Sequence, residues 1–128
     1  MAMLKTRREA STATLEPVGV LYGCPGKELE RIVAFSQAVD VPAGRTLYEQ
    51  GRIPLDFMLV ESGHAAVVVG GRKVADIGPG ETIGEMGVLD HAPRSATVVA
   101  RTPMRVRLVD AHDVDALMEA APTFARAL

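Results

Sequence analysis

The sequence has one cysteine, no tryptophan and no long apolar run, and each of these shortages excludes a class of protein. A single thiol, Cys24, cannot form an internal disulfide, so the chain is not a disulfide-stabilised scaffold. No stretch approaches the roughly 18–20 apolar residues that span a bilayer. The basic residues Lys5, Arg7 and Arg8 are followed by no apolar segment, so we predict no secretory signal and a cytoplasmic location.

The sequence also lacks an excess of positive charge, because 14 Lys and Arg residues stand against 16 Asp and Glu residues and the formal net charge is −2. Nucleic-acid binding depends on Lys and Arg that neutralise phosphates, so DNA and RNA are poor candidate partners. A small ligand with one negative charge is not excluded. The length of 128 residues allows one domain, and 48% hydrophobic with 23% charged residues is typical of a globular protein.

The chain divides into a polar segment and one domain. Residues 1–16 are polar, rich in Ser and Thr and without periodicity, which predicts a flexible N-terminal tail before a domain over 17–128. A helix is expected from Pro25 to about Ser36, because Pro suits the first turn and apolar residues follow at helical spacing.

Short Val-rich runs separated by Gly and Pro turns follow this helix. Residues 57–61, 65–69 and 97–101 are predicted strands, and residues 104–108 alternate apolar and polar as in a half-buried strand. About eight short strands predict a mainly β fold, an antiparallel double-stranded β-roll of jelly-roll type. A C-terminal helix is expected after Asp110 and should stop at Pro122.

The segment 80–98 carries the chemistry. Gly84 allows close approach of a ligand to the backbone, and the residues from Glu85 can form one or two helical turns with free N–H groups. Arg94 offers a planar fork of donors for a phosphate, whereas an ionised Glu85 accepts from a hydroxyl or an amine. The residue types alone leave open a second interpretation, in which Glu85 and Arg94 form an ion pair that closes a loop.

Residues 84–89 and 93–97 read GEMGVL and PRSAT. This pattern resembles the phosphate-binding cassette of cyclic nucleotide-binding domains, as in bacterial catabolite activators and regulatory subunits of protein kinase A. The turn and strand residues 49–51, 56–57 and 61–63 also resemble that family. The resemblance covers about residues 20–128 and implies the β-roll with an N-terminal helix, a short cassette helix and a C-terminal helix.

The resemblance also implies roles for individual residues. Glu85 would accept from the ribose 2′-hydroxyl of cAMP or cGMP, and Arg94 would pair with the cyclic phosphate. The implied ligand-binding set is Ile83, Gly84, Glu85, Met86, Gly87, Arg94, Ser95, Ala96, Val67 and Val74. Within this set, backbone N–H groups at Glu85, Met86 and Ala96 would complete the phosphate site, and Val67, Val74 and Ile83 would form apolar walls.

The resemblance is incomplete at the C-terminal end. The long helix that covers the pocket in the family would begin where this chain stops, at Leu128, so we expect the lid to be absent or supplied by another chain. No helix-turn-helix region is present. The predicted function is a non-enzymatic sensor module with conformational output to a protein partner, and the alternative is a scaffold that has lost its ligand.

The sequence gives little support for the interpretation that the chain is an enzyme. His64, His91 and His112 are far apart, so they offer no metal-ligand spacing for a cupin-like enzyme, and we predict no metal. Ser95 has no recognisable His and acid partners for nucleophilic catalysis. We therefore expect no cofactor beyond a cyclic nucleotide as ligand.

Overall fold

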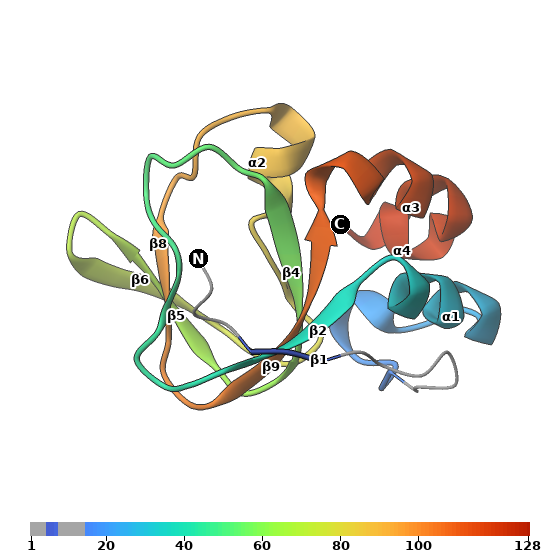
Figure 1. Ribbon diagram of the computed structural model, residues 1–128, viewed down its shortest axis with the longest axis horizontal. Coiled ribbons are helices and arrows are strands. Elements are labelled where there is room, and N and C mark those ends of the chain that lie inside the picture. The colour runs from blue at the N-terminus through green and yellow to red at the C-terminus, as the bar shows by residue number, and fades with distance from the viewer. Residues whose placement is uncertain (1–4, 8–14) are drawn as a thin grey trace.

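The computed structural model describes residues 5–7 and 15–128, and the fold is a β-roll with helices on one side (Figure 1). The nine strands within these residues are β1 Lys5–Arg7, β2 Gln37–Val41, β3 Thr46–Tyr48, β4 Asp56–Ser62, β5 Ala65–Val69, β6 Arg72–Ile77, β7 Thr82–Ile83, β8 Thr97–Ala100 and β9 Met104–Asp110. The helices are α1 Gly26–Ala34, α2 Glu85–Asp90, α3 Val114–Ala120 and α4 Pro122–Ala127, with 3₁₀ turns at Gly19–Leu21 and Ala111–Asp113.

The strands form two antiparallel sheets. One has the order β1-β2-β9-β4-β7 and the other the order β3-β8-β5-β6. Each described pairing is antiparallel, and strands distant in sequence lie side by side, as β2 and β9 do. The predicted fold class, an antiparallel double-stranded β-roll with an N-terminal, a short cassette and a C-terminal helix, is confirmed.

Strand β4 separates two apolar cores because its residues alternate between its faces. Met58 and Val60 lie in the core between the two sheets, whereas Phe57 and Leu59 lie in a second core beneath the helices. The second core also contains residues of α1, α3 and α4, which gather on one side of the roll in Figure 1. Val88 of α2 also belongs to this helical core, so the short helix shares an apolar core with α1, α3 and α4.

Side chains of helix α1 form hydrogen bonds with the junction between α3 and α4. The Glu28 carboxylate accepts hydrogen bonds from the Thr123 N–H at 2.9 Å, the Thr123 hydroxyl at 2.8 Å and the Phe124 N–H at 3.2 Å. Arg31 donates to the Ala120 carbonyl at 2.8 Å, at the end of α3. Burial raises the pKa of Glu28, but the hydrogen bonds from Thr123 and Phe124 lower it below the usual value. Pro122 stands in the first turn of α4, and α3 stops before it, as the sequence predicted.

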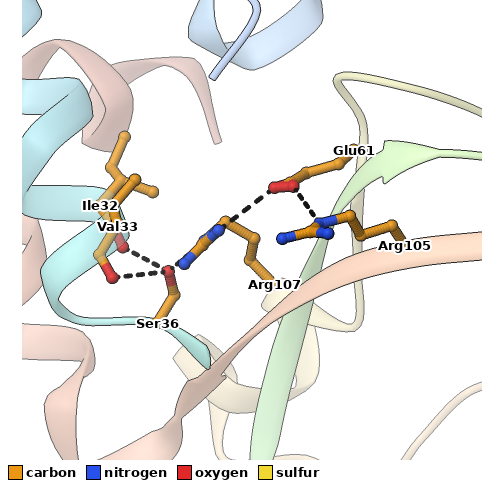
Figure 2. A network of polar contacts seen from close by, with 6 residues as sticks. All are labelled: Ile32, Val33, Ser36, Glu61, Arg105 and Arg107. Atoms are coloured by element: carbon orange, nitrogen blue, oxygen red, sulfur yellow. Dashed lines mark hydrogen bonds and ion pairs between the residues drawn. The ribbon is translucent and has the colours of Figure 1, made fainter. Parts of the chain in front are cut away.

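The outer face of β9 contains a polar network that the sequence did not predict (Figure 2). Arg107 is only 1% exposed, because the end of α1 covers this part of the strand. Its guanidinium donates to Ser36 Oγ at 2.7 Å and to Glu61 Oε1 at 3.2 Å, while Arg105 Nε donates to Glu61 Oε2 at 3.0 Å. The expectation of a half-buried strand over 104–108 is therefore wrong at Arg107, since helices cover its polar face.

The predicted tail over residues 1–16 lies mostly outside the described residues and stays a prediction there. Two parts of it are described. Residues Lys5–Arg7 pair with β2, and Leu15 is 3% exposed in the helical core. The core of the domain therefore includes Leu15, which lies two residues before the expected domain boundary at residue 17.

Candidate functional site

A cleft of about 330 Å³ lies between α2, the segment before β8 and the inner face of the roll. Its walls come from β3, β5, the end of β6, β7, α2 and β8, so both sheets contribute to it. The lining residues are Tyr48, Val67, Ile77, Thr82, Ile83, Gly84, Glu85, Met86, Gly87, Asp90, Ala92, Pro93, Arg94, Ser95, Ala96 and Val98. One face of the cleft is thus apolar, and the other combines the short helix, which carries a carboxylate, with the guanidinium of Arg94 from the segment before β8.

The cleft brings together nine of the ten residues predicted for the site. These nine are Ile83, Gly84, Glu85, Met86, Gly87, Arg94, Ser95, Ala96 and Val67. The tenth, Val74, does not line it: this residue is 60% exposed on the edge strand β6. The cause is a bulge in the pairing of β5 and β6, where Val67 faces Ala75 but Val68 faces Lys73, which leaves Val74 out of register.

Gly84 immediately precedes α2 and determines how closely Arg94 can approach the start of this helix. The residue has φ 82° and ψ 8°, a left-handed conformation that favours glycine. Its carbonyl accepts a hydrogen bond from Arg94 Nη1 at 2.6 Å, and a Cβ atom at this position would overlap the guanidinium. The first turn of α2 has N–H groups without intrahelical acceptors, so glycine places these donors and Arg94 on the same side of the cleft.

Arg94 is buried, with 6% of its surface exposed, and its guanidinium is surrounded by protein groups. Besides Gly84, it donates through Nη2 to the Asp56 backbone carbonyl, and Nη2 lies 3.7 Å from the Asp56 carboxylate. The guanidinium carbon lies 3.7 Å from the centre of the Tyr48 ring, a cation–π arrangement. These contacts fix the arginine at the base of the cleft.

Tyr48 and Asp56 form a hydrogen-bonded pair beneath Arg94. The Tyr48 hydroxyl donates to Asp56 Oδ1 at 2.5 Å. Burial, with the neighbouring carboxylate, raises the pKa of Tyr48 well above its usual value, so the hydroxyl remains a donor. Burial also raises the pKa of Asp56, although the hydrogen bond from Tyr48 and the charge of Arg94 act in the opposite direction.

The interpretation of Glu85 and Arg94 as a loop-closing ion pair is wrong. The carboxylate paired with Arg94 in the described part of the chain is Asp56, and none of the ion pairs found there includes Glu85. Glu85 instead lines the cleft from the first residue of α2. Its carboxylate thus accompanies the guanidinium in the cleft without binding it.

Sequence reasoning missed several lining residues and the base of the site. Asp56 was noted only as part of a turn pattern, and Tyr48 carried no signal, because β3 and β4 meet the Arg94 segment only in the folded chain. The other unpredicted lining residues are Ile77, Thr82, Asp90, Ala92, Pro93 and Val98. All of these except Ile77 lie within the segment 80–98, which indicated the region but not each side chain.

The remaining candidates for chemistry are dispersed. His112 lies 3.7 Å from Asp110, and His91 takes a left-handed conformation with φ 53° at the end of α2. Across residues 5–7 and 15–128 we find no group of three or more His, Cys, Asp or Glu side chains placed to hold a metal ion. In the same residues, no helix combines the length and the apolar character needed to traverse a bilayer.

The chemistry of the cleft suits a small anion that also carries hydroxyl groups and an apolar part. Helix N–H groups and a guanidinium favour negative charge, and a carboxylate a few residues away accepts from a hydroxyl. The wall formed by Val67, Ile77, Ile83 and Val98 favours a flat or apolar group.

Comparison with known proteins identifies a matching family and similar sequences. The family model for the cyclic nucleotide-binding domain matches residues 38–121. The acetyltransferase Pat of Mycolicibacterium smegmatis is 37% identical over 98% of this chain, which corresponds to 38% of Pat. The cAMP-dependent protein kinase regulatory subunit of Aspergillus fumigatus is 37% identical over 78% of this chain and 25% of its own length.

Solved structures agree in fold. The Thermus thermophilus catabolite activator protein superposes with a TM-score of 0.76 at 30% identity, over 84% of this chain and 53% of that one. The present chain therefore spans between about a quarter and two fifths of the length of these two curated relatives and about half of the solved one.

Proposed function

The chain belongs to the cyclic nucleotide-binding domain family, and from this membership we propose that it is a non-enzymatic sensor module that binds cAMP or cGMP. One observation carries the proposal: Gly84, Glu85 and Arg94 meet at a single cleft without Glu85 and Arg94 neutralising each other.

The cyclic phosphate is assigned to the start of α2 and Arg94. There the N–H groups of Glu85 and Met86, with that of Ala96, supply donors that complement the guanidinium. Glu85 accepts from the ribose 2′-hydroxyl, and Ser95 adds a hydroxyl close to the phosphate. The base lies against the apolar wall that includes Val67 and Ile83.

The output of binding is assigned to α2 and the helical layer. Val88 of α2 packs in the same core as Leu117 of α3 and Phe124 of α4, so a shift of α2 changes the packing of the C-terminal helices. In this proposal the ligand favours one arrangement of these helices, and a protein partner in the cytoplasm detects it. Pat and the kinase regulatory subunit are longer proteins that match this chain over one part only, which supports a module that controls a separate activity.

Calorimetric titration of the purified chain with cAMP and cGMP tests the binding step. We titrate cAMP first, because a cyclic AMP receptor protein of Thermus thermophilus is 31% identical over 85% of this chain. Linear 5′-AMP is the matched control, since it keeps the base and ribose but lacks the cyclic diester. Saturable heat with a cyclic nucleotide and none with 5′-AMP is expected, and no heat up to millimolar cAMP and cGMP would overturn the proposal.

A ligand-independent interaction scaffold is the second candidate, and one observation favours it: both terminal nitrogens of Arg94 already donate to protein groups. Thermal unfolding across a panel of nucleotides separates the two candidates. A ligand that binds only the folded state raises the melting temperature with concentration, whereas a scaffold shows no shift.

A further inference from the structure

We propose that Asp56, held by the Tyr48 hydroxyl, is a resident counterion of Arg94 that competes with the anionic ligand for this guanidinium. The inference rests on the proposed function, since it concerns the same cleft, and it adds two residues that set its affinity. Both lie on strands outside the segment 80–98, Tyr48 at the end of β3 and Asp56 at the start of β4.

The geometry places the carboxylate where it can compensate the charge of Arg94. Asp56 Oδ1 lies 3.7 Å from Arg94 Nη2, and the Asp56 carbonyl accepts from the same nitrogen. A buried guanidinium without a counterion is costly, so this contact stabilises the chain when no ligand is bound. The same carboxylate repels any anion that approaches Arg94 from the cleft.

Tyr48 holds the counterion in place. Its hydroxyl donates to Asp56 Oδ1 at 2.5 Å while its ring lies under the guanidinium at 3.7 Å. One side chain therefore contacts both charges, and the two charged groups lie 3.7 Å apart, a longer distance than the 2.6 Å hydrogen bond from Arg94 to Gly84. The ion pair is thus loose, and a phosphate can take over the guanidinium without breaking a short bidentate pair.

The titratable and charged groups that face Asp56 come from three elements. Tyr48 faces it from β3 and Arg94 from the segment before β8, and Asp110 faces it from the paired strand β9, where it raises the pKa of Asp56. His112 lies beside Asp110 at 3.7 Å. Burial is the largest cause of the raised pKa, so Asp56 takes up a proton at a higher pH than an ordinary aspartate.

The decisive variant is Asp56→Asn, which keeps the size and the backbone carbonyl and removes the negative charge. Without its counterion Arg94 is unpaired in the free protein, and the phosphate meets no repulsion, so we expect cAMP or cGMP to bind roughly tenfold more tightly. The melting temperature without ligand should fall, and the rise caused by saturating ligand should be larger than in the wild type.

The pH dependence gives a second test on the unmodified chain. A bound phosphate raises the pKa of Asp56 further, so the complex holds a proton up to a higher pH than the free protein. Affinity should therefore increase as pH falls through the pKa of the complex and level off below that of the free protein. The quantity measured is the ratio of the dissociation constants of wild type and Asp56→Asn at each pH, since any effect of pH on groups that the two proteins share cancels in this ratio.

Tyr48→Phe provides the matched control because it keeps the ring under Arg94 and loses only the hydroxyl. Asp56 then loses a hydrogen bond that favours its charged form. When Tyr48→Phe takes the place of the wild type in the ratio of dissociation constants, the change of this ratio with pH should therefore occur at higher pH. Tighter binding by Asp56→Asn with this displacement supports the inference. Equal or weaker binding by Asp56→Asn, while the wild type binds, overturns it, whereas no binding by either protein overturns the proposed function as well.

Discussion

Two buried arginines, Arg94 and Arg107, differ in what surrounds them. Both are almost inaccessible, at 6% and 1% exposure. Arg94 donates to two backbone carbonyls and has one carboxylate at 3.7 Å, and it lines the cleft. Arg107 donates to the Glu61 carboxylate and the Ser36 hydroxyl, away from the cleft, where α1 ends against β9 (Figure 2).

This difference separates a binding role from a structural role. Arg94 forms only a loose ion pair, so an anion in the cleft can compensate its charge more closely than Asp56 does. The charge of Arg107 is hydrogen-bonded to side chains of β4 and of the segment after α1, so it joins the helical layer to the roll. Substitutions should therefore change affinity at Arg94 and stability at Arg107.

The largest effect is expected for Arg94→Leu. It leaves the phosphate without its main cation in a partly buried site, so cyclic nucleotide affinity should fall by about 3 kcal/mol, which is roughly a 150-fold increase in the dissociation constant. Calorimetry at fixed salt measures it. Arg52→Leu is the matched control, because Arg52 lies in the neighbouring loop with its side chain 74% exposed, where its charge is screened. A similar loss in both variants would contradict a specific contact by Arg94.

A smaller effect of another kind is expected for Arg107→Met. The substitution removes a hydrogen-bonded partner of Glu61 and a donor to Ser36, and the free energy of unfolding should fall by about 2 kcal/mol. Affinity should stay within twofold, since Arg107 does not line the cleft. Urea unfolding measures the first quantity and calorimetry the second. Arg101→Met, at an exposed position after β8, is the control for loss of charge alone.

The two arginines also differ in how far the sequence could predict them. Arg94 stands in a local motif with Gly84 and Glu85, all within eleven residues, so its place in a cleft was predictable. Arg107 was not, because the alternation over 104–108 indicates which residues share a face but not that α1 covers the polar one. Whether a strand face meets solvent or helices depends on packing between distant segments.

The same limit explains the errors within the site. Asp56 lies 38 residues before Arg94, and only the pairing of strands brings it to the guanidinium. The resemblance alone places Val74 in the wall, but the bulge in the pairing of β5 and β6 leaves this residue out of register with Val67. The fold class was predictable because it follows from short strands and regular turns, which are local signals.

The smallest effect is expected for Ser36→Ala, and it isolates one bond of the Arg107 network. The Ser36 hydroxyl donates to the Ile32 carbonyl at 2.5 Å and accepts from Arg107 Nε at 2.7 Å (Figure 2). Alanine leaves Nε without this acceptor while the pair with Glu61 remains, so the free energy of unfolding should fall by about 1 kcal/mol. Urea unfolding beside Ser62→Ala, an exposed serine at the end of β4, measures the difference. If Ser36→Ala weakened nucleotide binding without lowering stability, the network around Arg107 would be coupled to the cleft, and the division between the two arginines would not hold.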